Sequence, residues 1–402
     1  MKFVIEPAKK CAGRLGLLTG IDRIPDKSYK TPLLLFTEQN LSREVLEISG
    51  FQNIAVLLSF DCSVQMTNAL KLYKKGISEF IGLKECLTFV TIKNPCYPCL
   101  TGHHEKGSLP VYKKSGKINV TSEDYMTFIK ESMPDFFVTL ADGDTWHDCS
   151  KKRIIKSNER SNEMLDECIK HQQGIKVKWS KMIGTVEGGY SEHERRKSVD
   201  HIKQHDEKII GYFIDGLHRN GHDAVSLDSI KVNEIVKYTL SILPHDKIKI
   251  MLGAFLPNQV LELVSIGIDV FDSSFAILVS KMNRALTFNF NLQNPALLDS
   301  GPEIDLTDSK YKDDFSPFVE SCQCLTCKQH TKAYTNHLLN TKELLGPMLL
   351  TIHNLHHYKM YFEAIRECIK NDELSDLKEM IDVQYKNKTF SYEVQKNVAQ
   401  TN

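Results

Sequence analysis

Three cysteines and one histidine near the C-terminus form the pattern with the clearest chemistry. Cys322, Cys324 and Cys327 follow the spacing C-x-C-x-x-C, and 25 residues separate Cys327 from His353. Three thiolates and one imidazole are a ligand set of closed tetrahedral zinc sites, in which protein atoms fill every coordination position. No position is then left for water or substrate. We therefore predict one structural Zn²⁺ ion that stabilises the fold and takes no part in chemistry.

Other histidines and cysteines offer alternatives to this ligand set. His356 and His357 lie one helical turn from His353, and either could replace it as the fourth ligand. Cys96 and Cys99 form a second C-x-x-C pair, but prolines flank it and no complementary pair follows at a suitable spacing. This context favours ordinary thiols over a metal site or a redox pair.

Charge and hydropathy exclude several classes of protein. The 402 residues include 51 Lys and Arg and 51 Asp and Glu, so any contact with RNA would need a local basic patch. The N-terminus lacks the apolar region of a signal peptide, and no apolar run approaches the roughly 20 residues that cross a bilayer. The 11 cysteines are an odd number, which favours reduced thiols in the cytosol. We expect a cytoplasmic protein without a transmembrane segment.

Short apolar runs alternate with amphipathic stretches along most of the chain. The predicted strands lie within residues 133–144, 181–189, 209–217, 247–255 and 268–274, with earlier candidates at 31–37 and 53–60. The predicted helices include residues 157–172, 191–206, 227–243 and 257–267, the last with Pro257 at its start and Gly267 at its end. Such alternation is typical of parallel strands buried on both faces. It predicts an α/β fold, a (β/α)8 TIM barrel. The alternative is a doubly wound open sheet, but no glycine-rich nucleotide motif follows an early strand.

The C-terminal third has a different organisation. Residues 301–320 are acidic and polar and are predicted to form a loop, and a long helical stretch follows from about residue 334 to 370. We expect the barrel to comprise residues 1–385, with a zinc-binding subdomain at 318–357 within it and a polar tail at 386–402.

Carboxylates and glycines follow several of the predicted barrel strands. They are Asp142–Asp144, Glu187–Gly189, Asp215–Gly216 and Asp272. Asp and Gly are ordinary turn formers, so any one of these segments by itself indicates a loop. Four such segments lie at the carboxyl ends of predicted barrel strands, where barrel enzymes place their active sites. Together they predict a ligand pocket, either one that still functions or the remnant of an ancestral one.

The zinc pattern and its helix resemble those of the tRNA-guanine transglycosylases, the queuine tRNA-ribosyltransferases. The matching segments are CQCLTC, TKAYTNHLLNTKELLGPMLLTIHN, TVEGG at 185–189, YFIDGL at 212–217 and GIDVFDSS at 267–274. The resemblance extends from about residue 134 to 369. It implies exchange of guanine at the anticodon wobble position of tRNA for queuine or its precursor. It also places Asp272 where the family's aspartate attacks the ribose C1′ and forms a covalent intermediate.

The chain departs from the catalytic members at several positions. They follow the nucleophile with a P-T-R-type segment, where this chain reads DSSFAILVSKMNRALTF, and they carry glutamine where it has Glu187. They present G-G-L where it has Asp215, Gly216 and Leu217, and their S-G-G-F-Q motif has no counterpart in SEFIGLKECLTFVTIKNP. Each buried polar group left without its partner costs about 1–3 kcal/mol, so several losses together should abolish guanine exchange. We predict no catalytic residue in this chain.

The pattern therefore resembles the non-catalytic subunit of the eukaryotic enzyme. This resemblance implies a heterodimer with the catalytic subunit, contact with tRNA, a possible homodimer in the partner's absence, and peripheral association with the mitochondrial outer membrane. Two alternatives are an active transglycosylase that uses Asp272 as nucleophile, and a protein that binds queuine through Glu187 and Asp215 without reacting.

Overall fold

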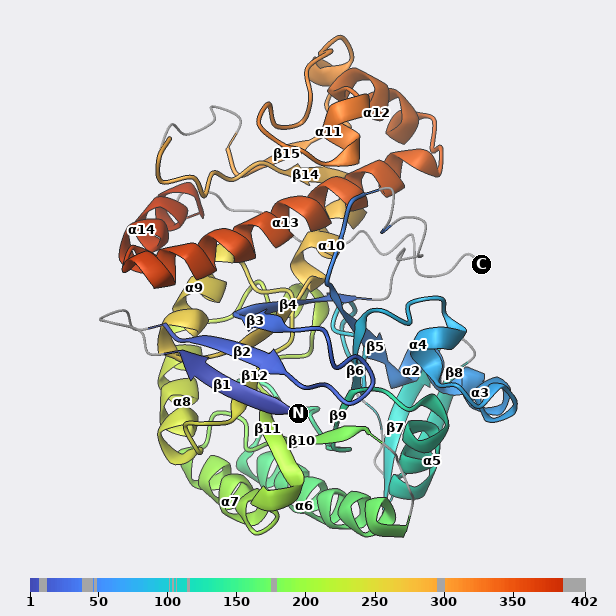
Figure 1. The fold of residues 1–402 in the computed structure, drawn as a ribbon. Coiled ribbons are helices and arrows are strands. Elements are labelled where there is room, and N and C mark those ends of the chain that lie inside the picture. The colour runs from blue at the N-terminus through green and yellow to red at the C-terminus, as the bar shows by residue number, and fades with distance from the viewer. Residues whose placement is uncertain are drawn as a thin grey trace.

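The centre of the molecule is a closed barrel of parallel strands surrounded by helices (Figure 1). The structure, a computed structural model, describes residues 1–6, 13–37, 46, 49–100, 102, 105, 107–113, 116–174, 179–294 and 301–385. The predicted polar tail at 386–402 lies outside the described residues.

Eight strands follow one another around the barrel in chain order. They are β4 (Leu33–Thr37), β5 (Ala55–Ser59), β6 (Leu87–Thr91), β9 (Phe136–Val138), β10 (Lys181–Val186), β11 (Ile209–Ile214), β12 (Ile248–Ile250) and β13 (Val270–Asp272). The pairing of β13 with β4, in which Val270 lies opposite Leu33, closes the barrel. The predicted (β/α)8 barrel is therefore confirmed. Seven strands lie within the predicted segments, whereas β6 was not predicted, because its five residues include two threonines and lack a clear apolar run.

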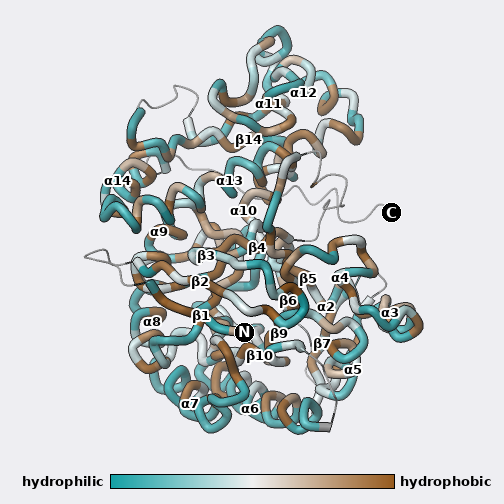
Figure 2. The backbone as a smooth tube through the Cα atoms, in the orientation of Figure 1, coloured by the Kyte–Doolittle hydropathy of each residue, from teal (hydrophilic) through white to brown (hydrophobic). Residues whose placement is uncertain are grey.

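The helices of the repeats cover the outside of the barrel (Figure 1). They are α5 (Ser122–Ser132), α6 (Lys151–Gly174), α7 (Glu192–Lys203), α8 (Ser229–Ile242), α9 (Pro257–Ile266) and α10 (Ser274–Lys281), with short α2 (Phe60–Ser63), α3 (Thr67–Tyr73) and α4 (Ile77–Phe80) after β5. Helix α9 begins at Pro257 and is capped by Gly267 at φ 110°, as the sequence predicts. Hydrophilic and hydrophobic stretches alternate along α6 and α7, as expected for helices with one face on the barrel (Figure 2).

An antiparallel sheet is tied to the amino ends of the barrel strands. It contains β1 (Lys2–Glu6), β2 (Leu15–Thr19) and β3 (Tyr29–Thr31). Arg14 donates to Asp269, which directly precedes β13, and Arg23 donates to Asp135, which directly precedes β9. This sheet therefore lies opposite the carboxyl ends of the strands. The hairpin of β7 (Ser108–Lys113) and β8 (Gly116–Thr121) is inserted between β6 and β9.

The C-terminal segment forms a second layer on one side of the barrel (Figure 1). It contains β14 (Arg284–Leu286), β15 (Glu303–Asp305), α11 (Leu325–Gln329), α12 (Lys332–Asn340), α13 (Leu345–Asn371) and α14 (Leu374–Tyr385). The predicted continuous helix from 334 to 370 is wrong: Lys342, at φ 60°, separates α12 from α13. The predicted loop at 301–320 contains β15, which pairs with β14. Helix α13 contacts the barrel through Tyr361, whose hydroxyl donates to the Pro257 carbonyl oxygen at 2.8 Å.

Candidate functional site

The four residues predicted to bind zinc come together between α11 and α13. The ligand atoms of Cys322, Cys324, Cys327 and His353 all lie within 4.8 Å of one another. His353 Nδ1 is 3.7, 3.6 and 3.3 Å from the three Sγ atoms, in chain order. In a tetrahedral site with Zn–S bonds of about 2.3 Å and a Zn–N bond of about 2.05 Å, the S···N separation is about 3.6 Å. The cluster therefore has the composition and the spacing to hold one metal ion such as zinc.

A hydrogen bond on the far side of the imidazole orients His353. Its Nε2 lies 2.8 Å from the carbonyl oxygen of Leu286 in β14. A carbonyl oxygen can only accept, so Nε2 carries the proton and Nδ1 presents a lone pair to the three thiols. The ring is fully buried and packs edge-on against Phe318, with ring centroids 5.0 Å apart. Such a second contact fixes both the tautomer and the direction of a metal-binding imidazole.

The structure distinguishes His353 from the two neighbouring histidines. Nδ1 of His356 lies 3.8 Å from Cys322 Sγ, but His356 does not belong to the four-residue cluster. The His357 ring packs against Phe288 with centroids 4.7 Å apart, and its Nε2 donates to the Phe288 carbonyl at 3.0 Å. His357 is therefore engaged in packing, and His353 is the histidine that faces all three cysteines.

The metal-site candidate connects a small separate core to the rest of the molecule. Among the residues that the structure describes, seven buried apolar side chains form this core: Ala285, Ile304, Leu306, Tyr311, Phe318, Leu339 and Leu350. Cys327 packs against them. Cys324 also caps α11, because its Sγ accepts a hydrogen bond from the Cys327 backbone N–H at 3.3 Å. A core of this size gains much from a cross-link, which is the role of structural metals in small domains.

The second C-x-x-C pair has a different environment. Cys96 Sγ contacts Thr37 Oγ1 at 3.7 Å, whereas Cys99 Sγ accepts from Asn220 Nδ2 at 3.3 Å. Both are free cysteines. Burial raises the pKa of each thiol to about 11, so both are neutral near pH 7.

The predicted carboxylates meet at the carboxyl ends of the barrel strands, in the region we call the barrel mouth. It comprises Asp142 and Asp144 after β9, Glu187 after β10, Asp215 after β11 and Asp272 in β13. Two of the acids are paired with basic side chains. Asp142 forms ion pairs with Arg153 at 2.5 Å and with Arg160 at 3.1 Å, and Asp144 forms one with Lys93.

Glu187 and Asp215 face each other inside the mouth. Glu187 is fully buried, and neither of its carboxylate oxygens has a hydrogen-bond partner among the described residues. Burial and then the Asp215 charge raise the pKa of Glu187 well above its usual range. Arg195 is also fully buried beside them, but it donates to backbone carbonyls, among them Asp215 O at 2.7 Å. Burial and the neighbouring Asp215 carboxylate thus disfavour the charged form of Glu187.

These carboxylates pack directly on the glycines that follow the strands. A Cβ atom placed at Gly143 would lie 2.3 Å from Asp215 Oδ2, and one at Gly216 would lie 2.3 Å from Glu187 Oε2. Gly216 has φ 76° and could not carry a side chain without strain. The glycines therefore accommodate the protein's own acids.

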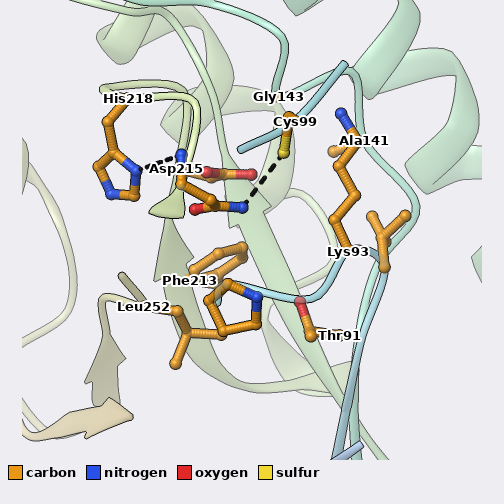
Figure 3. Close-up of a pocket in the computed structure, with 12 residues that line it drawn as sticks. Thr91, Lys93, Cys99, Ala141, Gly143, Phe213, Asp215, His218 and Leu252 are labelled. Atoms are coloured by element: carbon orange, nitrogen blue, oxygen red, sulfur yellow. Dashed lines mark hydrogen bonds between the residues drawn. The ribbon is translucent and has the colours of Figure 1, made fainter. Parts of the chain in front are cut away.

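The space left at the mouth is very small. Lys93, Cys99, Asp215 and His218 lie around a cavity of about 20 Å³ (Figure 3). This volume holds about one water molecule, whereas small-molecule pockets usually measure about 300–1,000 Å³. The predicted strand-end residues therefore come together, but they fill the mouth themselves.

Asp272 is buried and engaged by neighbouring donors. Its Oδ2 accepts from the Gly253 backbone N–H at 2.5 Å, and its Oδ1 accepts from the Ser274 N–H at 2.6 Å and from the Ser274 hydroxyl. Burial raises the pKa of Asp272 to about 6. The described residues that line the cavity do not include Asp272. Its two oxygens therefore have structural contacts and do not face an open substrate site.

Sequence reasoning did not find the basic residues of the mouth. Lys93 and Arg195 occupy it, but neither lies in a motif that points to the mouth. Lys93 follows the apolar run FVTI, and Arg195 lies in the charged stretch EHERRK of a predicted helix. The only signal in the sequence is position: Lys93 lies in the segment SEFIGLKECLTFVTIKNP, which lacks the base-recognition motif of the catalytic members.

Fold and site together define a (β/α)8-barrel protein with a C-terminal Cys3His metal-site candidate and a filled barrel mouth. The profile of a family described as queuine tRNA-ribosyltransferase matches residues 10–387, and the chain belongs to this family.

The curated relatives share a more specific name. Proteins named queuine tRNA-ribosyltransferase accessory subunit 2 from Culex quinquefasciatus and Aedes aegypti are each 40% identical to this chain. The alignments span 94% and 96% of this chain and 90% and 93% of the relatives. The protein of the same name from Drosophila melanogaster is 37% identical over 95% of this chain and 92% of its own length. Within the described residues, no helix is both long enough and apolar enough to span a membrane.

Proposed function

We propose that this chain is the non-catalytic subunit of a heterodimeric queuine tRNA-ribosyltransferase. In this role it supports the exchange of guanine for queuine at the anticodon wobble position of tRNA, while its partner carries out the reaction. The names of relatives that align along nearly the whole chain support this function. The observation that carries it is the filled barrel mouth.

Base exchange has two structural requirements that the mouth does not meet. The purine needs a pocket with matched hydrogen-bond partners, but the cavity of about 20 Å³ is smaller than any base. The nucleophile needs a carboxylate oxygen that can approach the ribose carbon to about 3–3.5 Å before attack. Both oxygens of Asp272 are instead bound by Gly253 and Ser274. Lys93 and Asp144 occupy the mouth as an ion pair.

The chain retains the parts that an assembly subunit needs. The closed barrel and the C-terminal layer on α13 are intact, so the surface can still serve a partner subunit and tRNA although the mouth is closed. The balance of 51 basic and 51 acidic residues is compatible with a subunit that supplies only part of an RNA-binding surface. A homodimer in the partner's absence would use the same surface.

The proposal includes one structural zinc ion at Cys322, Cys324, Cys327 and His353. The S···N separations of 3.3–3.7 Å and the Nε2 hydrogen bond of His353 support this assignment. When bound, the ion would cross-link α11 to α13 and hold the subdomain at 318–357 within the unit at 1–385. We further propose that the protein acts in the cytoplasm and associates peripherally with the mitochondrial outer membrane.

A base-exchange assay with radiolabelled guanine and tRNA tests this function. This chain alone should incorporate no label, and adding the catalytic subunit should give incorporation by a complex with the mass of a heterodimer. Asp272→Asn in this chain should leave the activity of the complex unchanged. As the matched control, replacing the nucleophilic aspartate of the catalytic subunit by asparagine should abolish it. Native mass measurement and the melting temperature show whether the Asp272→Asn variant still folds and assembles.

The same samples test the alternative of an active transglycosylase. Asp272 retains the family position at the end of β13, so an active enzyme would form a covalent adduct with RNA through it. Exchange by this chain alone, or a denaturation-resistant RNA adduct that Asp272→Asn removes, would overturn the proposed function.

A further inference from the structure

We propose that Asp166, His201 and His205, on the outside of the barrel, form a second metal site for an exchangeable divalent transition-metal ion. This site is separate from the Cys3His cluster and from the barrel mouth, and it does not depend on the function proposed above.

The three side chains converge from two neighbouring helices. Asp166 lies on α6, His201 lies in the last turn of α7, and His205 follows one turn later, directly before a 3-10 turn at Asp206–Lys208. Both imidazoles point to the same atom: Nε2 of His201 and of His205 lie 3.0 and 3.2 Å from Asp166 Oδ1. All three ligand atoms lie within 4.8 Å of one another.

These distances suit a shared metal ion. With metal–nitrogen and metal–oxygen bonds of about 2.0–2.2 Å, two ligand atoms of a tetrahedral site are separated by about 3.3–3.6 Å, a few tenths of an ångström more than the separations seen here. The rings are inclined by 71° with centroids 6.2 Å apart, so they can approach one ion from different directions. In the metal-free protein the two imidazole N–H groups donate to the carboxylate. An ion would replace these two protons, with the three side chains separating slightly around it.

The chemistry of the donors selects the kind of ion. Two imidazoles and one carboxylate suit Zn²⁺, Co²⁺, Ni²⁺ or Cu²⁺, whereas Mg²⁺ and Ca²⁺ prefer oxygen ligands alone. Three protein ligands leave at least one position for water or for a side chain of another molecule. This open site differs from the Cys3His cluster, in which protein atoms supply all four ligands.

The site is accessible to solvent, and its backbone is anchored. The side chains of His201 and His205 are 25% and 26% exposed and that of Asp166 is 51% exposed, so an ion can enter without local unfolding. Elsewhere along the same helix pair, the buried Asn158 of α6 donates to the Glu194 carbonyl of α7 at 3.0 Å. A bound ion would add a second link between these helices.

Zinc titration of the full-length chain, purified with its first zinc ion bound, tests the proposal. Isothermal titration calorimetry with Zn²⁺ should show one further ion per chain. His201→Ala and His205→Ala should each weaken its binding at least tenfold, and the double substitution should abolish it. His193→Ala is the matched control, because His193 is an exposed histidine of the same helix outside the site. It should leave the titration unchanged, and circular dichroism should show all variants folded.

The identity of the ligands is tested with Co²⁺. Cobalt bound as the second ion should give visible d–d absorption without the intense thiolate charge-transfer band expected of the cysteine cluster. Cys324→Ser should leave this second binding event intact. The proposal is overturned if the zinc-containing chain binds no further ion, or if the double histidine variant binds it as tightly as the unmodified protein.

Discussion

Replacing Cys324 by serine separates the metal-binding role of this side chain from its role as a helix cap. The thiol faces His353 Nδ1 at 3.6 Å, and it also accepts the Cys327 backbone N–H at 3.3 Å. A serine hydroxyl is a good N-cap acceptor but a poor ligand for zinc. Cys324→Ser should therefore preserve the start of α11 while it removes one of four metal ligands.

The expected loss is large. Structural zinc contributes about 10–16 kcal/mol in zinc-finger peptides, which shared among four ligands is about 2.5–4 kcal/mol each. This energy corresponds to about a 70- to 900-fold loss of zinc affinity. The core that the ion supports is small, with seven buried apolar side chains among the described residues. Loss of the ion should therefore make residues 301–344 sensitive to proteolysis before the barrel unfolds.

The assay is zinc content by elemental analysis after dialysis against a chelator that leaves one zinc ion on the unmodified chain. Cys149→Ser is the matched control, because its thiol also accepts a backbone N–H, from Trp146 at 3.4 Å, but lies outside the cluster. It should retain zinc. If Cys324→Ser also keeps one ion per chain under these conditions, Cys324 is not a ligand and the assignment of the cluster fails.

Four further substitutions test other contacts. His353→Ala should lose zinc and His356→Ala should keep it, which elemental analysis would show; the reverse result would exchange their roles. Arg14→Met should lower the free energy of unfolding by about 3–5 kcal/mol in urea titrations, because it leaves the buried Asp269 carboxylate unpaired, and a change below 1 kcal/mol would refute this. Burial raises the pKa of Asp215 from 3.8 to about 6, so the folded state binds more protons between these values and stability falls as pH rises through this window. Asp215→Asn should therefore stabilise the protein more at pH 8 than at pH 4.5, with a difference of up to about 3 kcal/mol in the free energy of unfolding. Melting temperatures at the two pH values measure this difference, and an equal effect at both would contradict the raised pKa of Asp215.

Much of the architecture could be predicted from local patterns. Seven barrel strands and the helix from Pro257 to Gly267 have periodicity and end signals that are set by neighbouring residues. Strand β6 was missed because its five residues, LTFVT, include two threonines and form no clear apolar run, and only the closed barrel buries them. The break between α12 and α13 was missed because a single residue, Lys342, adopts a positive φ without a glycine to mark it.

The sequence by itself determined the repeat pattern of the barrel, the cysteine spacing and the departures from the catalytic motifs, because each is a property of residues close together in the chain. Only the tertiary structure decided that His353 and not His356 faces all three thiols, since this depends on the rotation of α13 against β14. The structure also decided what the departures do. Lys93 meets Asp144 across 51 positions of sequence, and Glu187 packs on Gly216, so the acids and bases of separate strands close one mouth. Contacts between distant segments arise from the closure of the barrel, and no spacing along the chain encodes them.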